Sequence, residues 1–290
     1  MSAPVGLVLE GGGMRVTYTA GALDAFLDEG VDFPYVIGVS AGANAGSNYV
    51  VGQRERNHRV FVEMVADPRY AGWANLLRER SWFGMRFLFE TLPDELAPYR
   101  YADLAASPRT LVTGVTDCAT ALPVYLCHRD HDPRWFVSTA LRATSSLPVL
   151  SPAVRIGGRR CLDGGVSDPI PLARAVADGN PRNVIVLTRN AGYRKGPPRF
   201  RAATQLFLAR YPAIRRALRT RHLRYNATLQ HIEELERAGS AFVLRPAAPL
   251  VVGRMERDVA KLAALYRQGY DETIACLAEL KVWLASPSRD

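Results

Sequence analysis

The sequence predicts an α/β fold in three layers (α/β/α), in which a mostly parallel central sheet lies between two layers of helices. Two observations support this prediction. Short apolar runs of strand length alternate along the chain with longer segments that have the spacing of helices. Several of these runs are apolar throughout, as expected for strands that are covered on both faces.

The alternation begins at the N-terminal end of the chain. Strands are predicted at residues 5–10 and 35–39. The first leads through three glycines into a helix at 17–30, whose last glycine suits a helix C-terminus. The second leads through Ser40 into a run of small residues that suits a tightly packed helix. Residues 54–66 predict another helix.

Turn residues and prolines divide the rest of the chain. Gly157 and Gly158, between two short apolar runs, predict a hairpin. Asp168 and Pro169 predict a helix start, and the long helical segment 200–238 is predicted to restart at Pro212. The predicted strands are 110–115, 124–127, 153–156, 159–162, 184–188 and 242–244, and the predicted helices are 134–143, 172–177 and 256–284.

The chain is long enough for one large domain. It has 290 residues with 48% apolar content, and no linker clearly divides it. We expect a single domain over residues 1–290, with a motif-bearing core at about 5–190 and a basic helical region at about 199–285.

The composition also predicts where the protein is found. Residues 1–10 lack the basic start of a secretory peptide, and no window approaches the roughly 18 apolar residues of a membrane span. The four cysteines form no CxxC pair, which indicates reduced thiols. We therefore expect a cytoplasmic protein.

The net charge of +9 belongs to one segment. Between Asp178 and Glu233 there are twelve basic residues and no acidic one. Outside this segment, 25 basic and 28 acidic residues nearly balance.

The segment Gly38-Val39-Ser40-Ala41-Gly42 is a G-x-S-x-G motif. A serine at this spacing between a strand and a helix lies on a strained turn, and the flanking glycines leave room for the backbone to reverse. The positive end of the following helix stabilises a developing alkoxide. Ser40 is therefore a candidate nucleophile. The alternative is a small-residue turn that packs a helix onto a sheet.

Three consecutive glycines, Gly11, Gly12 and Gly13, follow the first strand and lead into a helix. Because they lack side chains, their N–H groups can face an anion. In an acyl-transfer enzyme that anion is the tetrahedral oxyanion, and each donor is typically worth about 3 kcal/mol. A phosphate loop is the competing interpretation, but the run lacks the G-x-x-x-x-G-K-[ST] spacing, and Val16 breaks a G-x-G-x-x-G.

A serine nucleophile needs a base, and Asp163 is the candidate. It ends a strand-like run and precedes Gly164 and Gly165, so a flexible turn can bring its carboxylate to a hydroxyl. The alternative is an ordinary Asp-Gly turn. None of the five histidines lies in a turn typical of a late catalytic histidine loop.

Together these motifs resemble those of the bacterial patatin-like phospholipases, over roughly residues 5–188. In the family's order they are Gly11-Gly12-Gly13-Met14-Arg15, the G-x-S-x-G around Ser40, and Asp163-Gly164-Gly165. The resemblance implies a patatin-like fold and hydrolysis of phospholipid or related lipid esters without a metal or an organic cofactor. It implies Ser40 as nucleophile, Asp163 as general base in a Ser–Asp dyad, and the segment from Gly11 to Arg15 as oxyanion hole.

A dyad of this kind depends on the environment of the aspartate. An exposed aspartate, with a pKa near about 4, is a poor base at neutral pH. The dyad works where burial raises that pKa, or where the oxyanion hole and helix dipole ease ionisation of the serine.

Three other functions remain open. An acyltransferase would use the same serine and pass the acyl group to an alcohol. A soluble carboxylesterase would prefer small esters. A binding protein would keep the fold without turnover, and Val16, where the family usually has glycine, favours this last alternative.

Two regions bear on how a lipid ester substrate is reached. Residues 67–99 have no clean period, and their aromatics suit a lid or acyl pocket as well as an ordinary core; they are Trp73, Trp82, Phe83, Phe87 and Phe89.

The second region is residues 200–232. One predicted helix face there is apolar, and the other side carries Arg201, Arg215, Arg216 and Arg219. These arginines form either a solvated face or a contact with an anionic membrane surface, worth up to about 1 kcal/mol each. A peripheral position at the inner membrane face would follow. We expect no nucleic acid partner, because nothing resembles a recognition helix.

Overall fold

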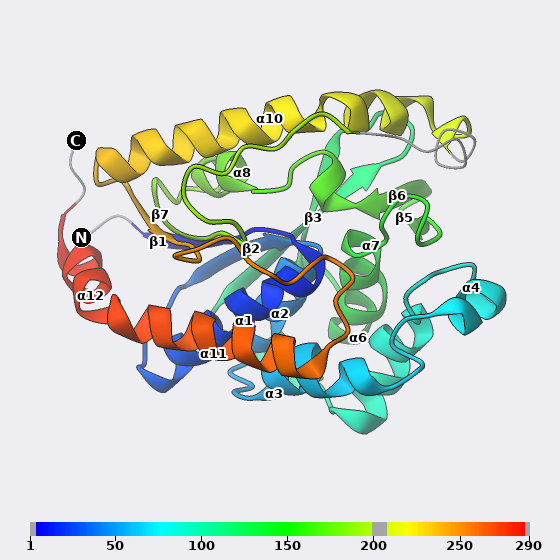
Figure 1. Cartoon of the computed structure of the whole chain (residues 1–290), viewed down its shortest axis with the longest axis horizontal. Helices are drawn as coiled ribbons and strands as arrows, with labels where there is room; N and C mark the ends of the chain where they lie inside the picture. The colour runs from blue at the N-terminus through cyan, green and yellow to red at the C-terminus, as the bar shows by residue number, and fades with distance from the viewer. Residues whose placement is uncertain (1–3, 199–207, 288–290) are drawn as a thin grey trace.

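The computed structural model describes residues 4–198 and 208–287, and it confirms the predicted α/β/α architecture (Figure 1). In this part of the chain one eight-stranded sheet runs in the order β5-β6-β3-β2-β1-β7-β8, with β4 paired to β3. Its strands are β1 Val5–Leu9, β2 Tyr35–Val39, β3 Thr110–Asp117, β4 Pro123–Cys127, β5 Val154–Ile156, β6 Arg159–Asp163, β7 Arg182–Val186 and β8 Ala241–Leu244. The strands β3, β2, β1, β7 and β8 are parallel, whereas β4, β5 and β6 add antiparallel pairs.

Helices cover both faces of the sheet. In Figure 1, α8 and α10 lie on one side of it, and α1, α2 and α11 lie on the other. The α-helices are α1 Thr17–Asp28, α2 Ala41–Val50, α3 Arg56–His58, α4 Trp73–Glu79, α5 Tyr101–Ala106, α6 Pro133–Trp135, α7 Arg142–Thr144, α8 Leu172–Ala177, α10 Pro212–Arg237, α11 Val259–Ala275 and α12 Leu277–Ala285. Short 3-10 or π segments are η1 Gly13–Val16, η2 Arg59–Glu63, η3 Met64–Ala66, η4 Phe87–Leu96, η5 His128–Asp130, η6 Phe136–Leu141 and η7 Gly164–Val166.

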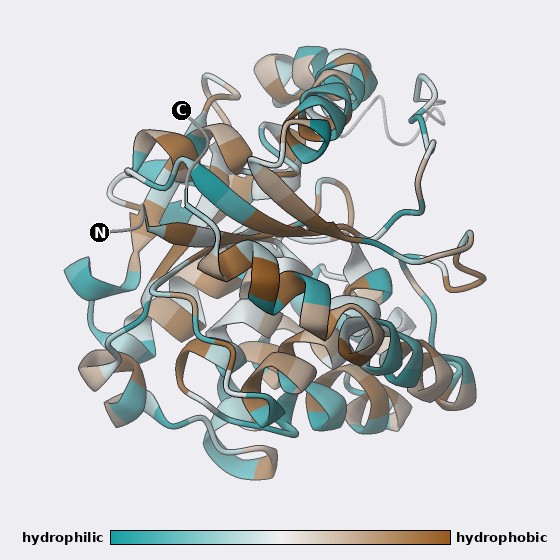
Figure 2. Ribbon diagram, turned by 90° about the vertical axis from the view of Figure 1, so that its left-hand side faces the viewer, coloured by the Kyte–Doolittle hydropathy of each residue, from teal (hydrophilic) through white to brown (hydrophobic). Residues whose placement is uncertain are grey.

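The described residues form three apolar clusters, and the two larger ones lie on opposite faces of the sheet. Alternate residues of β1 enter different cores: Leu7 and Leu9 join the larger one, and Val8 joins the one toward α8 and α10. The central strands are accordingly apolar in Figure 2, while polar residues line the outer faces of the helices around them.

Most predicted elements are confirmed, with two corrections. The hairpin turn has Gly157 and Gly158 at φ values of 51° and 78°, which glycine adopts without strain. The helix predicted at 172–177 is confirmed as α8, but the helix start predicted at Asp168 and Pro169 is wrong, since α8 begins at Leu172. Asp168 caps no helix there, because its carboxylate accepts a hydrogen bond from the Tyr125 hydroxyl at 2.6 Å.

The second correction concerns the closing helix, which is interrupted at Cys276 between α11 and α12. The restart at Pro212 is confirmed, since Pro212 stands at the first position of α10. The part of the predicted helix at 199–207 lies outside the described residues.

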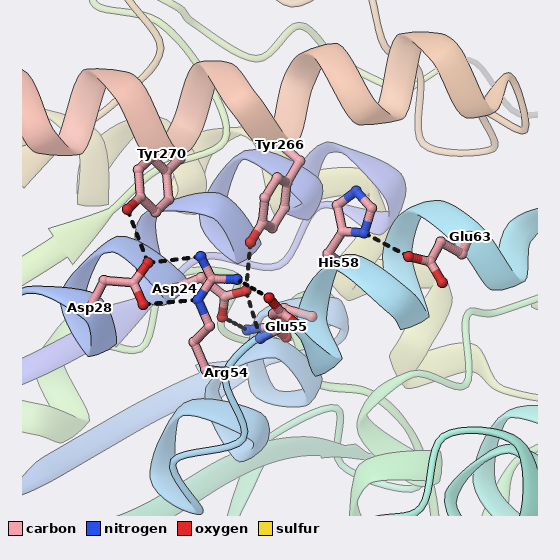
Figure 3. Close-up of polar contacts among 9 residues, drawn as sticks. Asp24, Asp28, Arg54, Glu55, His58, Glu63, Tyr266 and Tyr270 are labelled. Atoms are coloured by element: carbon pink, nitrogen blue, oxygen red, sulfur yellow. Dashed lines mark hydrogen bonds and ion pairs between the residues drawn. The ribbon is translucent and has the colours of Figure 1, made fainter.

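Helix α11 is joined tightly to α1. A Cβ atom on Gly21 would collide with the Tyr266 carbonyl, and one on Gly269 would collide with the Tyr18 carbonyl. Side chains extend this contact, since the Tyr266 hydroxyl donates to Asp24 at 2.6 Å (Figure 3).

Further along the same interface, the Tyr270 hydroxyl donates to Asp28 at 2.9 Å, and Arg54 also binds Asp28 (Figure 3). The C-terminal helices are thus fixed to the first helix of the chain. None of the helices in the described part of the chain combines the length and apolar content needed to cross a bilayer.

Candidate active site

The sheet register brings the three motifs to one edge. Strands β1 and β2 are parallel neighbours, so the glycine loop after β1 and the serine after β2 emerge side by side. Strand β3 links the serine to the third motif, because Val39 lies opposite Gly114 and Asp163 lies opposite Val115. Asp163 is therefore placed one register step from the residue that precedes Ser40.

Ser40 occupies a strained turn at the start of α2. Its φ of 55° and ψ of −137° lie outside the regions that side chains favour. The flanking glycines are required by space. A Cβ on Gly38 would lie 2.8 Å from the Ala43 nitrogen, and one on Gly42 would lie 2.5 Å from the Glu10 carbonyl oxygen.

Two side chains that the sequence analysis missed hold this turn. The Ser40 N–H donates to Thr144 Oγ1 at 2.9 Å, and the Thr144 hydroxyl donates to the Gly114 carbonyl at 2.5 Å. Asn44 Nδ2 donates to the Ser40 carbonyl at 2.9 Å. These bonds offset the cost of the strained conformation. Asn44 lies one helical turn after Ser40, but no local signal points to Thr144.

The Ser40 hydroxyl donates directly to Asp163 Oδ2 at 2.6 Å. The other carboxylate oxygen accepts the Gly165 N–H at 2.7 Å. Asp163 is 2% exposed and Ser40 is 8% exposed. Burial raises the pKa of Asp163, while the hydrogen bonds from Ser40 and Gly165 act in the opposite direction.

The glycine loop offers fewer free donors than its length suggests. The Gly11 N–H donates to the Pro169 carbonyl at 3.3 Å, and the Met14 N–H donates to the Arg254 carbonyl at 3.2 Å. Within the described residues, the Gly12 and Gly13 N–H groups have no such partner. Both glycines line a cavity together with Ser40.

Arg15 and Val16 lie behind this loop. Arg15 is half-buried, and burial lowers its pKa to about 10, with Arg189 and Arg254 adding repulsion. Val16 is fully buried in the larger core and lines neither cavity at Ser40.

An apolar pocket of about 100 Å³ begins at Ser40. Ser40, Asn44 and Asn48 all line it, so it follows one face of α2 over eight residues, or roughly 12 Å. Of the five aromatics predicted for a lid or acyl pocket, Phe83 and Phe89 line this pocket. Its other lining residues are Gly13, Met14, Ala41, Ser47, Arg56, Val60, Phe61, Tyr70, Met85, Leu88, Leu92, Pro93, Tyr99, Val137, Leu141, Ser145 and Leu147.

A second cavity of about 700 Å³ lies between the glycine loop, Asp163 and the C-terminal region. Lys195, Arg221 and Arg254 line it. His222 lines it as well, although the Ser40 hydroxyl donates to Asp163 and not to an imidazole.

The sequence predicts that one of these cations, Arg221, faces inward. Arg221 is three residues after Leu218 and four before Tyr225, so it lies on the apolar face of α10 and not with the exposed arginines. A cation on an apolar face points inward to a cavity or a partner.

In its described part, α10 has the exposed arginine face and the buried apolar face that the sequence predicts. Arg215, Arg216 and Arg219 are exposed, while Ile214, Tyr225, Leu229 and Ile232 are buried. Arg201 lies outside the described residues.

Comparison with known proteins identifies the family. The model of the patatin-like phospholipase family matches residues 7–176, which is more than half of the chain. The chain belongs to this family, which is one of lipid acyl hydrolases. Residues 211–285 match a second model, a domain of unknown function, DUF6363.

Curated relatives are distant and longer. The uncharacterized protein YjjU of Escherichia coli (strain K12) is 26% identical over an alignment of 195 residues that covers 63% of this chain and 52% of that protein. The uncharacterized NTE family protein Rv1063c of Mycobacterium tuberculosis (strain ATCC 25618 / H37Rv) is 25% identical over an alignment of 206 residues that covers 68% of this chain and 52% of that protein. The chain thus spans about half the length of the curated relatives it matches.

A solved structure shares the fold. The crystal structure of VipD from Legionella pneumophila matches with a TM-score of 0.52 and 14% identity, covering 96% of this chain and 68% of that one. At this identity the match concerns the fold alone.

Proposed function

We propose that this protein is a serine acyl hydrolase that cleaves ester bonds of phospholipids or related lipids through a Ser40–Asp163 dyad. One observation carries the proposal: the buried 2.6 Å hydrogen bond from the Ser40 hydroxyl to Asp163, at the mouth of an apolar pocket. Membership of the patatin-like phospholipase family supports the reaction class.

The reaction proceeds in two steps. Ser40 Oγ attacks the ester carbonyl while its proton passes to Asp163, and the Gly12 and Gly13 N–H groups stabilise the oxyanion. Asp163 then returns the proton to the departing alcohol, which leaves an acyl-serine. Water, deprotonated by Asp163, releases the fatty acid and restores Ser40. The apolar pocket along α2 holds the acyl chain.

The buried position of Asp163 is what makes it a usable base. Because burial raises its pKa above the ordinary value, its conjugate acid is weaker and it accepts the serine proton more readily at neutral pH.

The same acyl-serine suits an acyltransferase, since the cavity of about 700 Å³ beside Ser40 has room for an alcohol acceptor. Analysis of products with and without added alcohols separates the two reactions. For a catalytically inactive binding protein, Ser40 would not be labelled by a fluorophosphonate probe.

We also propose that Arg215, Arg216 and Arg219 bring the enzyme to an anionic membrane surface, because they are exposed on one helix. The tight contact of α11 with α1 supports the proposal that the chain forms a single domain.

The test compares fatty-acid release by the wild type with that by Ser40→Ala and Asp163→Asn. Asparagine keeps an oxygen for the Gly165 N–H but cannot take a proton. We expect both variants to lose at least about a thousandfold in activity. Asp163→Asn should melt no lower than the wild type at neutral pH, because the folded state already disfavours the charged carboxylate. Full activity in Asp163→Asn would contradict the dyad.

A further inference from the structure

The cavity beside Ser40 gathers three cations that are attracted by the carboxylates of Glu10 and Asp163 but form no direct ion pair in the described part of the chain. Lys195, Arg221 and Arg254 line it. Over residues 4–198 and 208–287, none of these three side chains forms an ion pair with a carboxylate. The carboxylate that lines the cavity, Asp163, is already bonded to Ser40 and to a main-chain N–H.

Hydrogen bonds fix the position of each of these three residues. The Lys195 N–H donates to Asn226 Oδ1 at 2.8 Å, and Asn226 Nδ2 donates back to the Lys195 carbonyl at 3.0 Å. Arg221 Nε donates to the Gly165 carbonyl, which leaves its terminal N–H groups for a ligand. The Arg254 carbonyl accepts the Met14 N–H.

The cluster is electrostatically costly without a bound anion. Burial lowers the pKa of Lys195 to about 7, and repulsion from Arg221 and Arg254 adds to the shift. Burial also lowers the pKa of Arg221, with Arg254 as the next cause. An anion with several acceptor oxygens would offset this repulsion through charge-assisted hydrogen bonds.

The position of the cavity indicates that the anion belongs to the substrate. Gly13 and Ser40 line both this cavity and the apolar pocket. An ester whose carbonyl reaches Ser40 with its acyl chain in the apolar pocket therefore extends its alcohol part toward Lys195 and Arg254.

We propose that Lys195, Arg221 and Arg254 bind the phosphate group on the alcohol part of the substrate, so that the enzyme selects phosphate-bearing glycerolipids over neutral ones. This inference rests on the proposed function.

The experiment compares monomeric dihexanoyl phosphatidic acid with dihexanoylglycerol, both below the concentrations at which they aggregate. The variants are Lys195→Gln and Arg254→Gln, and exposed Arg237→Gln is the matched control. We expect each cavity variant to lower kcat/KM for the phosphate-bearing ester about tenfold more than it changes kcat/KM for dihexanoylglycerol, which has no phosphate. Arg221 is not used, because it also holds the turn after Asp163.

Binding of inorganic phosphate to Ser40→Ala, measured by calorimetry, gives a readout without turnover. We expect the double variant Lys195→Gln/Arg254→Gln in that background to lose this binding. If the cavity variants keep the wild-type kcat/KM for both esters, the phosphate site is overturned and the hydrolase is left intact. The wild type could instead be inert on both esters and still bind phosphate through Lys195 and Arg254. That result would overturn the hydrolase and show a site for free phosphate.

Discussion

The two cavities that meet at Ser40 share the residues around it, but only one of them also takes side chains from the C-terminal part of the chain. The apolar pocket is lined by residues between Gly13 and Leu147, all within the segment that matches the patatin-like family. The three cations of the basic cavity follow that segment, and Arg221 and Arg254 lie in the region that matches a domain of unknown function. Ser40, Asp163 and the apolar pocket thus come from one segment, whereas the cations beside them come from another. Substitutions in the two cavities should therefore change different properties of the enzyme.

The largest expected effect is a loss of activity at acidic pH. It should be the same whichever cavity a substrate occupies, because every ester needs Asp163 as the base. Since the pKa of Asp163 is raised, its carboxyl becomes protonated as the pH falls through that value and cannot take the serine proton. We expect kcat/KM to be full above this pKa and to fall about tenfold per pH unit below it. Rates measured from about pH 4 to about pH 8 should show this acid limb above the region of an exposed aspartate.

The acid limb also tests whether the two esters are hydrolysed with the same base. It should fall at the same pH for dihexanoylglycerol and for dihexanoyl phosphatidic acid. A profile that stays flat down to about pH 4 would mean that a different group takes the proton.

The next effect belongs to the apolar pocket alone. Val60 is half-buried and lines this pocket. We expect the indole ring of Val60→Trp to shorten the pocket. This variant should lower kcat/KM for a palmitoyl ester by at least about tenfold, while a butyryl ester is hydrolysed normally. Val60→Ile is the matched control and should change little. An equal loss for both esters would show damage to the site itself and not to the pocket.

A smaller effect tests how much the contact between α11 and α1 contributes to the free energy of unfolding. A Cβ on Gly269 meets the Tyr18 carbonyl, so we expect Gly269→Ala to lower the free energy of unfolding by about 1–3 kcal/mol. Gly253→Ala, where a Cβ meets open space, should have little effect. Urea denaturation followed by circular dichroism measures both variants. Two separate transitions would contradict the proposal of a single domain.

The smallest effect concerns the outer face of α10. We expect Arg216→Gln and Arg219→Gln each to weaken binding to vesicles with anionic lipid by up to about fivefold, because each exposed cation contributes up to about 1 kcal/mol at such a surface. Cosedimentation with anionic and with neutral vesicles measures the difference. Hydrolysis of monomeric esters should not change. If it falls together with vesicle binding, the outer arginines belong to the basic cavity and the distinction drawn between them is wrong.

Much of the site could be predicted from the sequence because its motifs are local. A strand that ends at Gly38 and a serine followed by small residues require the turn that Ser40 adopts. The hairpin glycines and Pro212 act over one or two residues in the same way, and they were predicted correctly.

The tertiary structure alone decided which of these groups can work together. The sequence predicts five oxyanion-loop residues, but long-range bonds to Pro169 and Arg254 occupy the Gly11 and Met14 N–H groups. The prediction of Asp168 as a helix N-cap was wrong for a similar reason, since its carboxylate accepts a hydrogen bond from Tyr125 on another strand.

The sequence by itself determined the fold class, the order of the motifs and the candidate nucleophile and base, because strand length, glycine spacing and turn chemistry are properties of neighbouring residues. Only the tertiary structure placed Asp163 against Ser40 and gathered Lys195, Arg221 and Arg254 in one cavity. Sheet register joins Ser40 to Asp163 across 123 positions, helix and loop packing brings the three cations together, and no local spacing encodes these contacts.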